Sequence, residues 1–270
     1  AESEGAMGVE KRSSGGADSN VARANGHQSD GKGAAVNITK GRKSLHLLRK
    51  LFHALAGVAL ASVYEVLLDR QTTLKVFGVL LVLLALGEGL RFAFPESFFA
   101  TLSLRVTSAL ARTYEIKHMS GMIFFLTGVL FCIYFYPKNV AILAILYLSV
   151  GDPCASACGI RWGHHSMKFS NGKSLVGFLG GMAACFGCTL AYFWQSHGPS
   201  AELIAVSLWG GVVGATTELL CGRVLYSDGE TKGGPIDIDD NLAVPIFSGA
   251  LFWGVLSFFP HVSHYHGTFD

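Results

Sequence analysis

Hydrophobic residues gather into seven long segments between residues 51 and 260 of this chain. Each segment approaches the roughly 20 residues that an α-helix needs to cross about 30 Å of hydrocarbon. The segments cover residues 51–68, 72–90, 120–136, 139–159, 174–195, 201–221 and 242–260. Because helices satisfy their own backbone hydrogen bonds in lipid, the pattern predicts an all-α, polytopic integral membrane bundle of about seven transmembrane helices.

Two further stretches have a different pattern. Residues 92–111 are less apolar and include Arg105, which favours an amphipathic helix at the membrane interface. Residues 1–39 are rich in Gly, Ser, Asn and charge without apolar periodicity, and we expect a disordered cytoplasmic N-terminal tail. The multi-spanning catalytic domain is then predicted to cover 40–261, with a short C-terminal tail at 262–270.

Composition agrees with a lipid bilayer as the surroundings of the chain. Half of the 270 residues are hydrophobic, 15% are charged, and the mean hydropathy is +0.41, which is too apolar for an ordinary soluble domain. The formal net charge of +2 does not indicate a nucleic-acid partner.

Lysine and arginine are distributed unequally between the two predicted sides of the membrane. Fourteen of them flank the segments on the side of the N-terminus, whereas the other side has Arg70, Lys75 and Lys138. Because cytoplasmic loops carry an excess of these residues, we expect a cytoplasmic N-terminus.

The fourth segment contains an acid, Asp152, between Gly151 and Pro153. Proline removes a backbone donor and crowds the preceding turn, so we expect the helix to break or kink at Asp152. A carboxylate beside exposed backbone groups would suit Mg²⁺, which binds one or two carboxylates together with substrate phosphates. The alternative is a polar residue that a neighbouring helix satisfies.

A lysine stands directly before the fifth segment, in Gly172-Lys173-Ser174. These residues are similar to the end of a P-loop, but Met167 occupies the position where that motif requires glycine. What is left is a lysine at a helix N-terminus, where free N–H groups and the helix dipole already favour phosphate.

Acidic residues also precede the last segment. Asp237, Asp239, Asp240 and Asn241 lie within five residues, and Glu218 lies inside the sixth segment. This density favours metal binding, and the alternative is that the acids offset basic groups on the same face.

A basic group stands at the start of the first segment. Arg49 and His53 are four residues apart and share a helix face, with Lys50 adjacent. They would either clamp phosphate or anchor the helix at the cytoplasmic interface.

Taken in order, these residues resemble a known enzyme family. The motifs are Arg-Lys-x-x-His at 49–53, Ser-Gly-x-x-Phe-Phe-Leu-x-Gly at 120–128, Gly-Asp-x-x-Ala-Ser at 151–156 with Gly159 and Gly163, Lys-Ser-x-x-Gly at 173–177, Glu218, and Asp-Asp-Asn-Leu-x-x-Pro at 239–245. The set is similar to the integral-membrane CTP-dependent lipid kinases, which include fungal diacylglycerol kinase, dolichol kinase and phytol kinase. The fungal CTP-dependent diacylglycerol kinases are the nearest match.

The resemblance implies transfer of the terminal phosphate of CTP to diacylglycerol, which gives phosphatidate, a step of phospholipid biosynthesis. It also implies an endoplasmic-reticulum or nuclear-envelope membrane and Mg²⁺ or another divalent cation. Asp152 with Asp239 or Asp240 would hold the metal, and a carboxylate such as Glu218, or His53, would accept the proton of the lipid hydroxyl. The groups expected to bind the nucleotide are Arg49, Lys50, Gly159, Lys173, Ser174 and Asn241.

Other functions compete with this one. Dolichol and phytol kinases share much of the motif set. A phosphatidate cytidylyltransferase would carry Asp-Arg and Asp-Ser before its last spans, where this chain has Asp239-Asp240-Asn241-Leu242. A secondary transporter would show a second interrupted span in a matching half, and we find none in the sequence.

Overall fold

The computed structural model describes residues 50–94, 120–221, 223–225, 231–233 and 238–263. All of them belong to one compact unit, Gly41–Asp270. The predicted tail at 1–39 and the interfacial helix beyond residue 94 lie outside the described residues, so both stay predictions.

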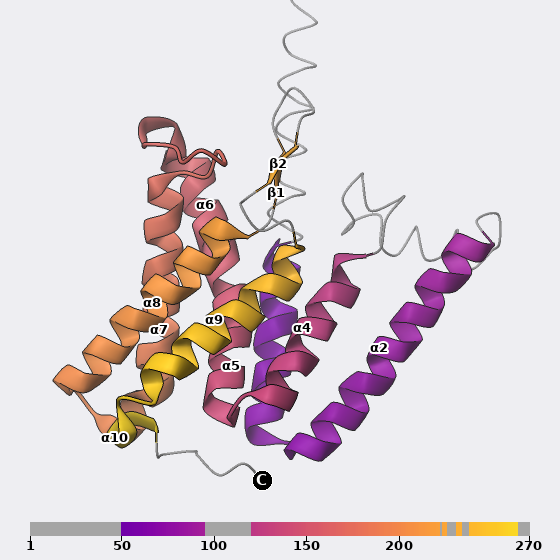
Figure 1. Ribbon diagram of the computed structural model, residues 1–270, viewed down its shortest axis with the longest axis horizontal. Helices are drawn as coiled ribbons and strands as arrows, with labels where there is room; N and C mark the ends of the chain where they lie inside the picture. The colour runs from indigo at the N-terminus through magenta and orange to yellow at the C-terminus, as the bar shows by residue number, and fades with distance from the viewer. Residues whose placement is uncertain (1–49, 95–119, 222, 226–230, 234–237, 264–270) are drawn as a thin grey trace, which may run out of the picture. The chain divides into compact units, whose positions relative to one another are not determined.

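Helices make up most of the described chain (Figure 1). A first helix covers residues 50–66. The others are α2 (Arg70–Ala93), α4 (Gly121–Phe135), α5 (Lys138–Leu146), the π-helical turn η1 (Tyr147–Gly151), α6 (Asp152–Trp162), the 3₁₀ turn η2 (Gly163–His165), α7 (Leu175–His197), α8 (Ala201–Leu220), α9 (Asp240–Leu256) and α10 (Pro260–Ser263). Two short antiparallel strands, β1 (Arg223–Leu225) and β2 (Thr231–Gly233), lie between α8 and α9 and were not predicted.

Four helical stretches in the described residues are long and apolar enough to cross a membrane. They are Arg70–Ala93, Lys138–His165, Leu175–Trp194 and Ala201–Leu220. α4 and α9 are apolar but shorter, at 15 and 17 residues. The predicted helical membrane architecture is therefore confirmed, and the count of seven spans stays a prediction.

Serine side chains cap the N-termini of several of these helices, close to the predicted starts. Ser174 accepts a hydrogen bond from the backbone of Gly177, and Ser200 accepts one from Leu203, each at 3.1 Å. Such side chains satisfy N–H groups that have no partner inside the helix. Each cap stands at the border between a polar loop and an apolar segment, which explains why hydropathy located the helix starts well.

Successive helices run in alternating directions along the bundle. Two contacts at one end of the bundle show this. Lys138, at the start of α5, donates to the carbonyl of Glu65, near the end of the first helix, at 3.0 Å. His197, at the end of α7, contacts the carbonyl of His261, which follows α9, at 2.8 Å. The starts of the first helix, α7 and α9 therefore share the opposite end with the end of α8.

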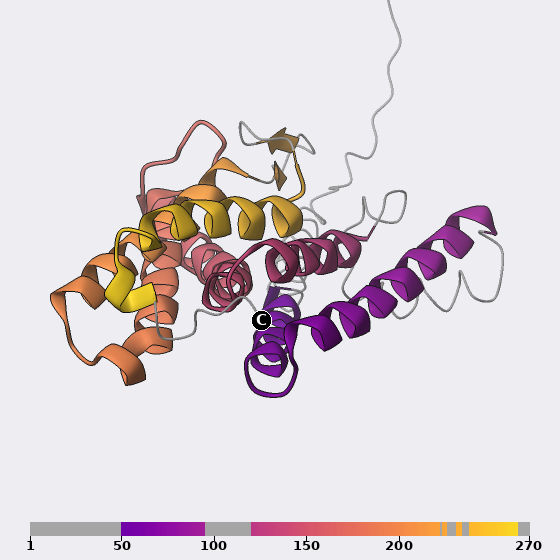
Figure 2. The same ribbon diagram turned by 60° about the horizontal axis from the view of Figure 1, so that its bottom comes forward.

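α7 and α8 lie side by side (Figures 1 and 2), and their close packing depends on glycine. A Cβ atom added at Gly211 would come within 2.7 Å of the carbonyl oxygen of Met182, and one added at Gly214 within 2.5 Å of the Cys185 sulfur. Small residues let helix backbones approach closely in a membrane, where association depends on van der Waals contact. By contrast, most of α2 is exposed, as expected for a helix that faces lipid.

The helix does not break at Asp152, so this half of the predicted break or kink is wrong, and the kink stays a prediction. The helix continues from Lys138 to His165 and contains the π-helical turn Tyr147–Gly151 directly before Asp152. Pro153 has no N–H and crowds the carbonyl one turn earlier, and a widened turn accommodates both effects without ending the helix. Asp152 still donates its own N–H to the Leu148 carbonyl.

Candidate active site

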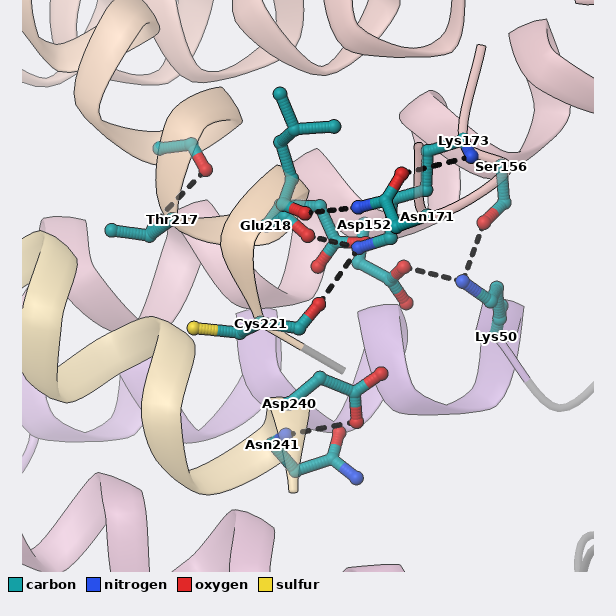
Figure 3. Close-up of polar contacts among 12 residues, drawn as sticks. Lys50, Asp152, Ser156, Asn171, Lys173, Thr217, Glu218, Cys221, Asp240 and Asn241 are labelled. Atoms are coloured by element: carbon teal, nitrogen blue, oxygen red, sulfur yellow. Dashed lines mark hydrogen bonds and ion pairs between the residues drawn. The ribbon is translucent and has the colours of Figure 1, made fainter. Parts of the chain in front are cut away.

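Lys50 connects the first helix to the helix that carries Asp152. Its ammonium forms an ion pair with the Asp152 carboxylate and donates a hydrogen bond to the hydroxyl of Ser156, one turn further along α6 (Figure 3). The side chains of Lys50 and Asp152 are only 10% and 16% exposed. Asp152 is therefore bound by an opposite charge in a region that water reaches poorly.

The residues before α7 form a tight loop, 167–174, which we call the lysine loop. The backbone N–H of Phe169 donates to the Lys173 carbonyl, and that of Gly172 donates to Phe169, both at 2.8 Å. Gly172 has a φ of 83°, which glycine adopts without steric cost. The loop therefore directs the side chain of Lys173 from a rigid turn.

The ammonium of Lys173 lies at the end of α8. It donates to the Glu218 carboxylate at 3.0 Å, to the Cys221 carbonyl at 2.9 Å and to the Glu218 carbonyl. The last carbonyls of a helix have no partner inside the helix and favour a cation. The sequence places Lys173 before one helix N-terminus, and the structure shows that its charge caps the C-terminus of another.

The charges of three carboxylates act on Lys173. Burial opposes its charge, but Glu218 first, then Asp152 and Asp240, raise the pKa of Lys173 above its ordinary value. The carboxylates therefore stabilise the charged form of Lys173. One oxygen of Glu218, Oε2, is buried and has no hydrogen-bond partner among the described residues.

Asp239 and Asp240 begin α9 and differ in their surroundings. Asp239 caps the helix by accepting a hydrogen bond from the Asn241 N–H at 3.0 Å. Asp240 also accepts from Asn241, and its charge acts on both Lys173 and Glu218. Figure 3 shows Asp240 on the α9 side of these residues. Asp240 is therefore a candidate partner of Asp152, and the choice between Asp239 and Asp240 stays a prediction.

Five charged side chains thus converge from five parts of the chain, and we call them the charge cluster: Lys50, Asp152, Lys173, Glu218 and Asp240 (Figure 3). Among the described residues, the cluster contains three carboxylates and two ammonium groups. Within the described residues, no three His, Cys, Asp or Glu side chains form a ready metal cage. Carboxylates are donors that suit Mg²⁺, which completes its coordination with substrate phosphates and water, so metal binding at Asp152 and Asp240 stays a prediction.

Two predicted nucleotide ligands have structural contacts of their own. The hydroxyl of Ser174 is buried and caps α7. A Cβ atom at Gly159 would lie 3.2 Å from that hydroxyl oxygen, so glycine permits the close contact of α6 with the start of α7. The roles of Ser174 and Gly159 in nucleotide binding stay predictions.

Three predicted site residues remain, and one of them lies outside the described chain. The ring of His53 packs edge-on against Phe125 of α4, with ring centroids 5.7 Å apart. Asn241 lies in the first turn of α9. Arg49 is outside the described residues. Proton transfer by His53 and nucleotide binding by Arg49 and Asn241 stay predictions.

Two residues that contact the charge cluster were not predicted to have a role in the site, although the Gly-Asp-x-x-Ala-Ser motif at 151–156 includes Ser156. Ser156 binds Lys50, and its helical spacing of four residues from Asp152 is a signal that could have revealed it. Asn171 binds the end of α8 through a hydrogen bond to the Leu219 carbonyl at 2.7 Å. An Asn-Gly pair predicts a turn but gives no indication of this distant partner.

Fold and site together define a polytopic helical membrane protein with a buried charge cluster at one end of the bundle. No family model matches the chain, and no solved structure matches it. Three curated fungal proteins do match, each named CTP-dependent diacylglycerol kinase 1.

The identities of these relatives are moderate and the coverage is broad. The Schizosaccharomyces pombe protein is 29% identical over 178 residues, which cover 63% of this chain and 75% of the relative. The Saccharomyces cerevisiae protein is 27% identical over 229 residues, covering 78% and 73%, and the Eremothecium gossypii protein 26% over 227 residues, covering 78% and 67%. They confirm the predicted resemblance to the fungal CTP-dependent diacylglycerol kinases, a family of enzymes.

Proposed function

We propose that this protein is a lipid kinase that transfers the terminal phosphate of CTP to diacylglycerol and so forms phosphatidate. The names of its three curated relatives support both the donor and the acceptor. The observation that carries the proposal is the charge cluster, in which cations and carboxylates from distant segments meet among apolar helices. Phosphoryl transfer needs mainly this: positioned charges and little covalent chemistry from the protein.

In the proposed reaction, the oxygen of the lipid hydroxyl forms a bond to the terminal phosphorus of CTP. The bond from that phosphorus to the bridging oxygen breaks, CDP leaves, and the hydroxyl proton passes to a basic group. Glu218 suits this last role because Oε2 is buried and makes no hydrogen bond within the described chain. His53 is the alternative.

The cations of the cluster neutralise phosphate. Lys50 and Lys173 supply two ammonium groups, and Arg49 adds a guanidinium directly before Lys50. Asp152 and Asp240 would hold a divalent cation, most suitably Mg²⁺, which would offset the charge of the triphosphate. Because Lys50 now pairs with Asp152, we expect the lysine to turn toward phosphate once the carboxylate binds the metal.

We place this site at the cytoplasmic face of an endoplasmic-reticulum or nuclear-envelope membrane. The alternating helices put the starts of the first helix, α7 and α9 at the site end, and the lysine-rich flanks of the sequence share that side. CTP is a soluble nucleotide and diacylglycerol stays in the bilayer, so an interfacial site is accessible to both.

The test uses purified full-length protein in mixed micelles with CTP labelled separately at the α and the γ phosphate. Diacylglycerol, dolichol and phytol serve as acceptors, phosphatidate is included as an acceptor of CMP, and ATP replaces CTP in parallel. We expect γ label on diacylglycerol only. Label that reaches lipid only from the α position would identify a cytidylyltransferase, and γ label on dolichol or phytol alone would change the proposed acceptor.

A further inference from the structure

Asn171 is a buried side chain in the lysine loop, only 8% exposed. Its amide nitrogen donates to the carbonyl of Leu219 at 2.7 Å, and its amide oxygen accepts from the backbone N–H of Lys173 at 3.1 Å. Both halves of the amide are therefore occupied. One half connects the loop to the end of α8, and the other connects it to the lysine of the charge cluster.

The hydrogen bonds of Asn171 and the side chain of Lys173 both join the lysine loop to the C-terminal end of α8. Leu219 follows Glu218 directly, and Lys173 donates to both the carboxylate and the carbonyl of Glu218. The lysine loop thus holds the last turn of α8 at successive carbonyls through two side chains. Each contact limits the movement that the other allows.

We propose that Asn171 is a positioning residue that fixes Lys173 against Glu218 and thereby sets the direction of the Glu218 carboxylate. This inference rests on the proposed function, because it assigns the asparagine to phosphoryl transfer. Asn171 contacts neither substrate nor metal in the proposal. It acts through Lys173, whose three N–H groups all have acceptors at the end of α8.

An amide is needed at this position because the residue must donate and accept at once. Aspartate would keep the acceptor for Lys173 but place a second oxygen against the Leu219 carbonyl. Alanine would remove both bonds and leave a buried carbonyl without its partner. Gly172, with a φ of 83°, follows immediately, so the backbone turn depends on glycine and is not set by the asparagine alone.

The test is a double-mutant cycle on turnover, with Asn171→Ala, Lys173→Met and the combined variant. We expect Asn171→Ala to lower kcat about tenfold, within the range for the loss of two hydrogen bonds, with KM for CTP and lipid within about twofold of wild type. In the Lys173→Met protein, the same change should have almost no further effect, because the side chain that it positions is gone.

Two controls make the cycle decisive. Ser170→Ala alters the exposed neighbour of Asn171 in the same loop and should leave kcat unchanged. Asn171→Asp should behave like Asn171→Ala, because it also lacks the donor to Leu219. Where Lys173→Met leaves too little turnover to measure, the cycle is followed through the unfolding temperature in micelles.

A further tenfold loss in the Lys173→Met background would overturn the proposal, since it would show a general structural role. A raised KM for CTP with unchanged kcat would overturn it too, by making Asn171 a substrate contact. Failure of the proposed function is visible separately, in wild-type protein that labels no lipid. The same cycle, measured as the unfolding temperature in micelles, then still tests the contact: independent, additive losses would disprove coupling between Asn171 and Lys173.

Discussion

Individual side chains at the site end of the bundle are held mainly by partners from distant parts of the sequence. Asp152 pairs with a lysine 102 residues away, and Lys173 with an acid 45 residues away. A buried charge that loses its partner costs far more than a surface pair contributes, since solvation is not restored. Substitutions in the charge cluster should therefore affect both turnover and the local structure.

Asp152→Asn keeps the size of the side chain and removes its charge. We expect turnover to fall at least about a hundredfold, because the proposed metal loses a ligand and Lys50 loses its counter-charge. Transfer of γ label to diacylglycerol measures the effect, with the membrane fraction as the check on insertion. Asp69→Asn is the matched control, since Asp69 caps α2 at the far end and asparagine caps equally well. Retained turnover in Asp152→Asn would remove this carboxylate from the mechanism.

Asp239 and Asp240 offer an internal comparison for metal binding. Asparagine preserves helix capping at either position, so the two changes differ mainly in which charge is lost. Asp240→Asn should raise the Mg²⁺ concentration for half-maximal turnover about tenfold, and Asp239→Asn should change it little. A Mg²⁺ titration of both variants decides the assignment, and the reverse ranking would make Asp239 the ligand.

At the scale of elements, contacts between helices depend on where glycine allows backbones to approach. α4 meets the first turns of α9 at Gly128, where a Cβ atom would come within 2.8 Å of the Asn241 carbonyl oxygen and 3.0 Å of the Pro245 ring. The start of α9 carries Asp240, so this packing contact also determines where one carboxylate of the charge cluster lies. The π-helical turn before Asp152 has a comparable effect on α6, because it keeps a proline-containing helix continuous.

Gly128→Ala should move α9 away from α4, since the atom in the way is backbone and cannot rotate aside. We expect the free energy of unfolding to fall by about 1–3 kcal/mol, the usual cost of overpacking, with a parallel loss of turnover. Gly78→Ala on α2 is the control, because nothing lies within 4 Å of its added Cβ and alanine favours helix. Unfolding in detergent, followed by circular dichroism, measures both. Equal stability of the two variants would show that α4 does not restrain α9.

For the whole molecule, the direction in which the bundle crosses the membrane decides which compartment supplies the nucleotide. One exposed residue at each end of the bundle can report the orientation. Lys168 lies in the lysine loop at the site end, and Gln71 lies in the first turn of α2 at the opposite end.

Lys168→Cys and Gln71→Cys report the orientation directly. In sealed microsomes, an impermeant maleimide should label Lys168→Cys from outside and should label Gln71→Cys only after permeabilisation, because lysine-rich ends stay cytoplasmic. The unsubstituted protein is the control for its native thiols, which are buried or partly buried. Labelling of Gln71→Cys in intact vesicles would invert the proposed topology.

The sequence by itself determined the helical membrane architecture and the positions of the helices to within a few residues, because hydropathy and capping are local properties of the chain. It also identified all five members of the charge cluster, since charged groups beside apolar segments are costly and therefore conspicuous. Only the tertiary structure decided their pairing, the continuous helix through Pro153, the capping of α8 by Lys173 and the hydrogen bonds of Asn171. Each of these depends on contacts between segments far apart in the chain, and a local pattern of residues carries no information on which distant carbonyl or carboxylate will meet a given donor.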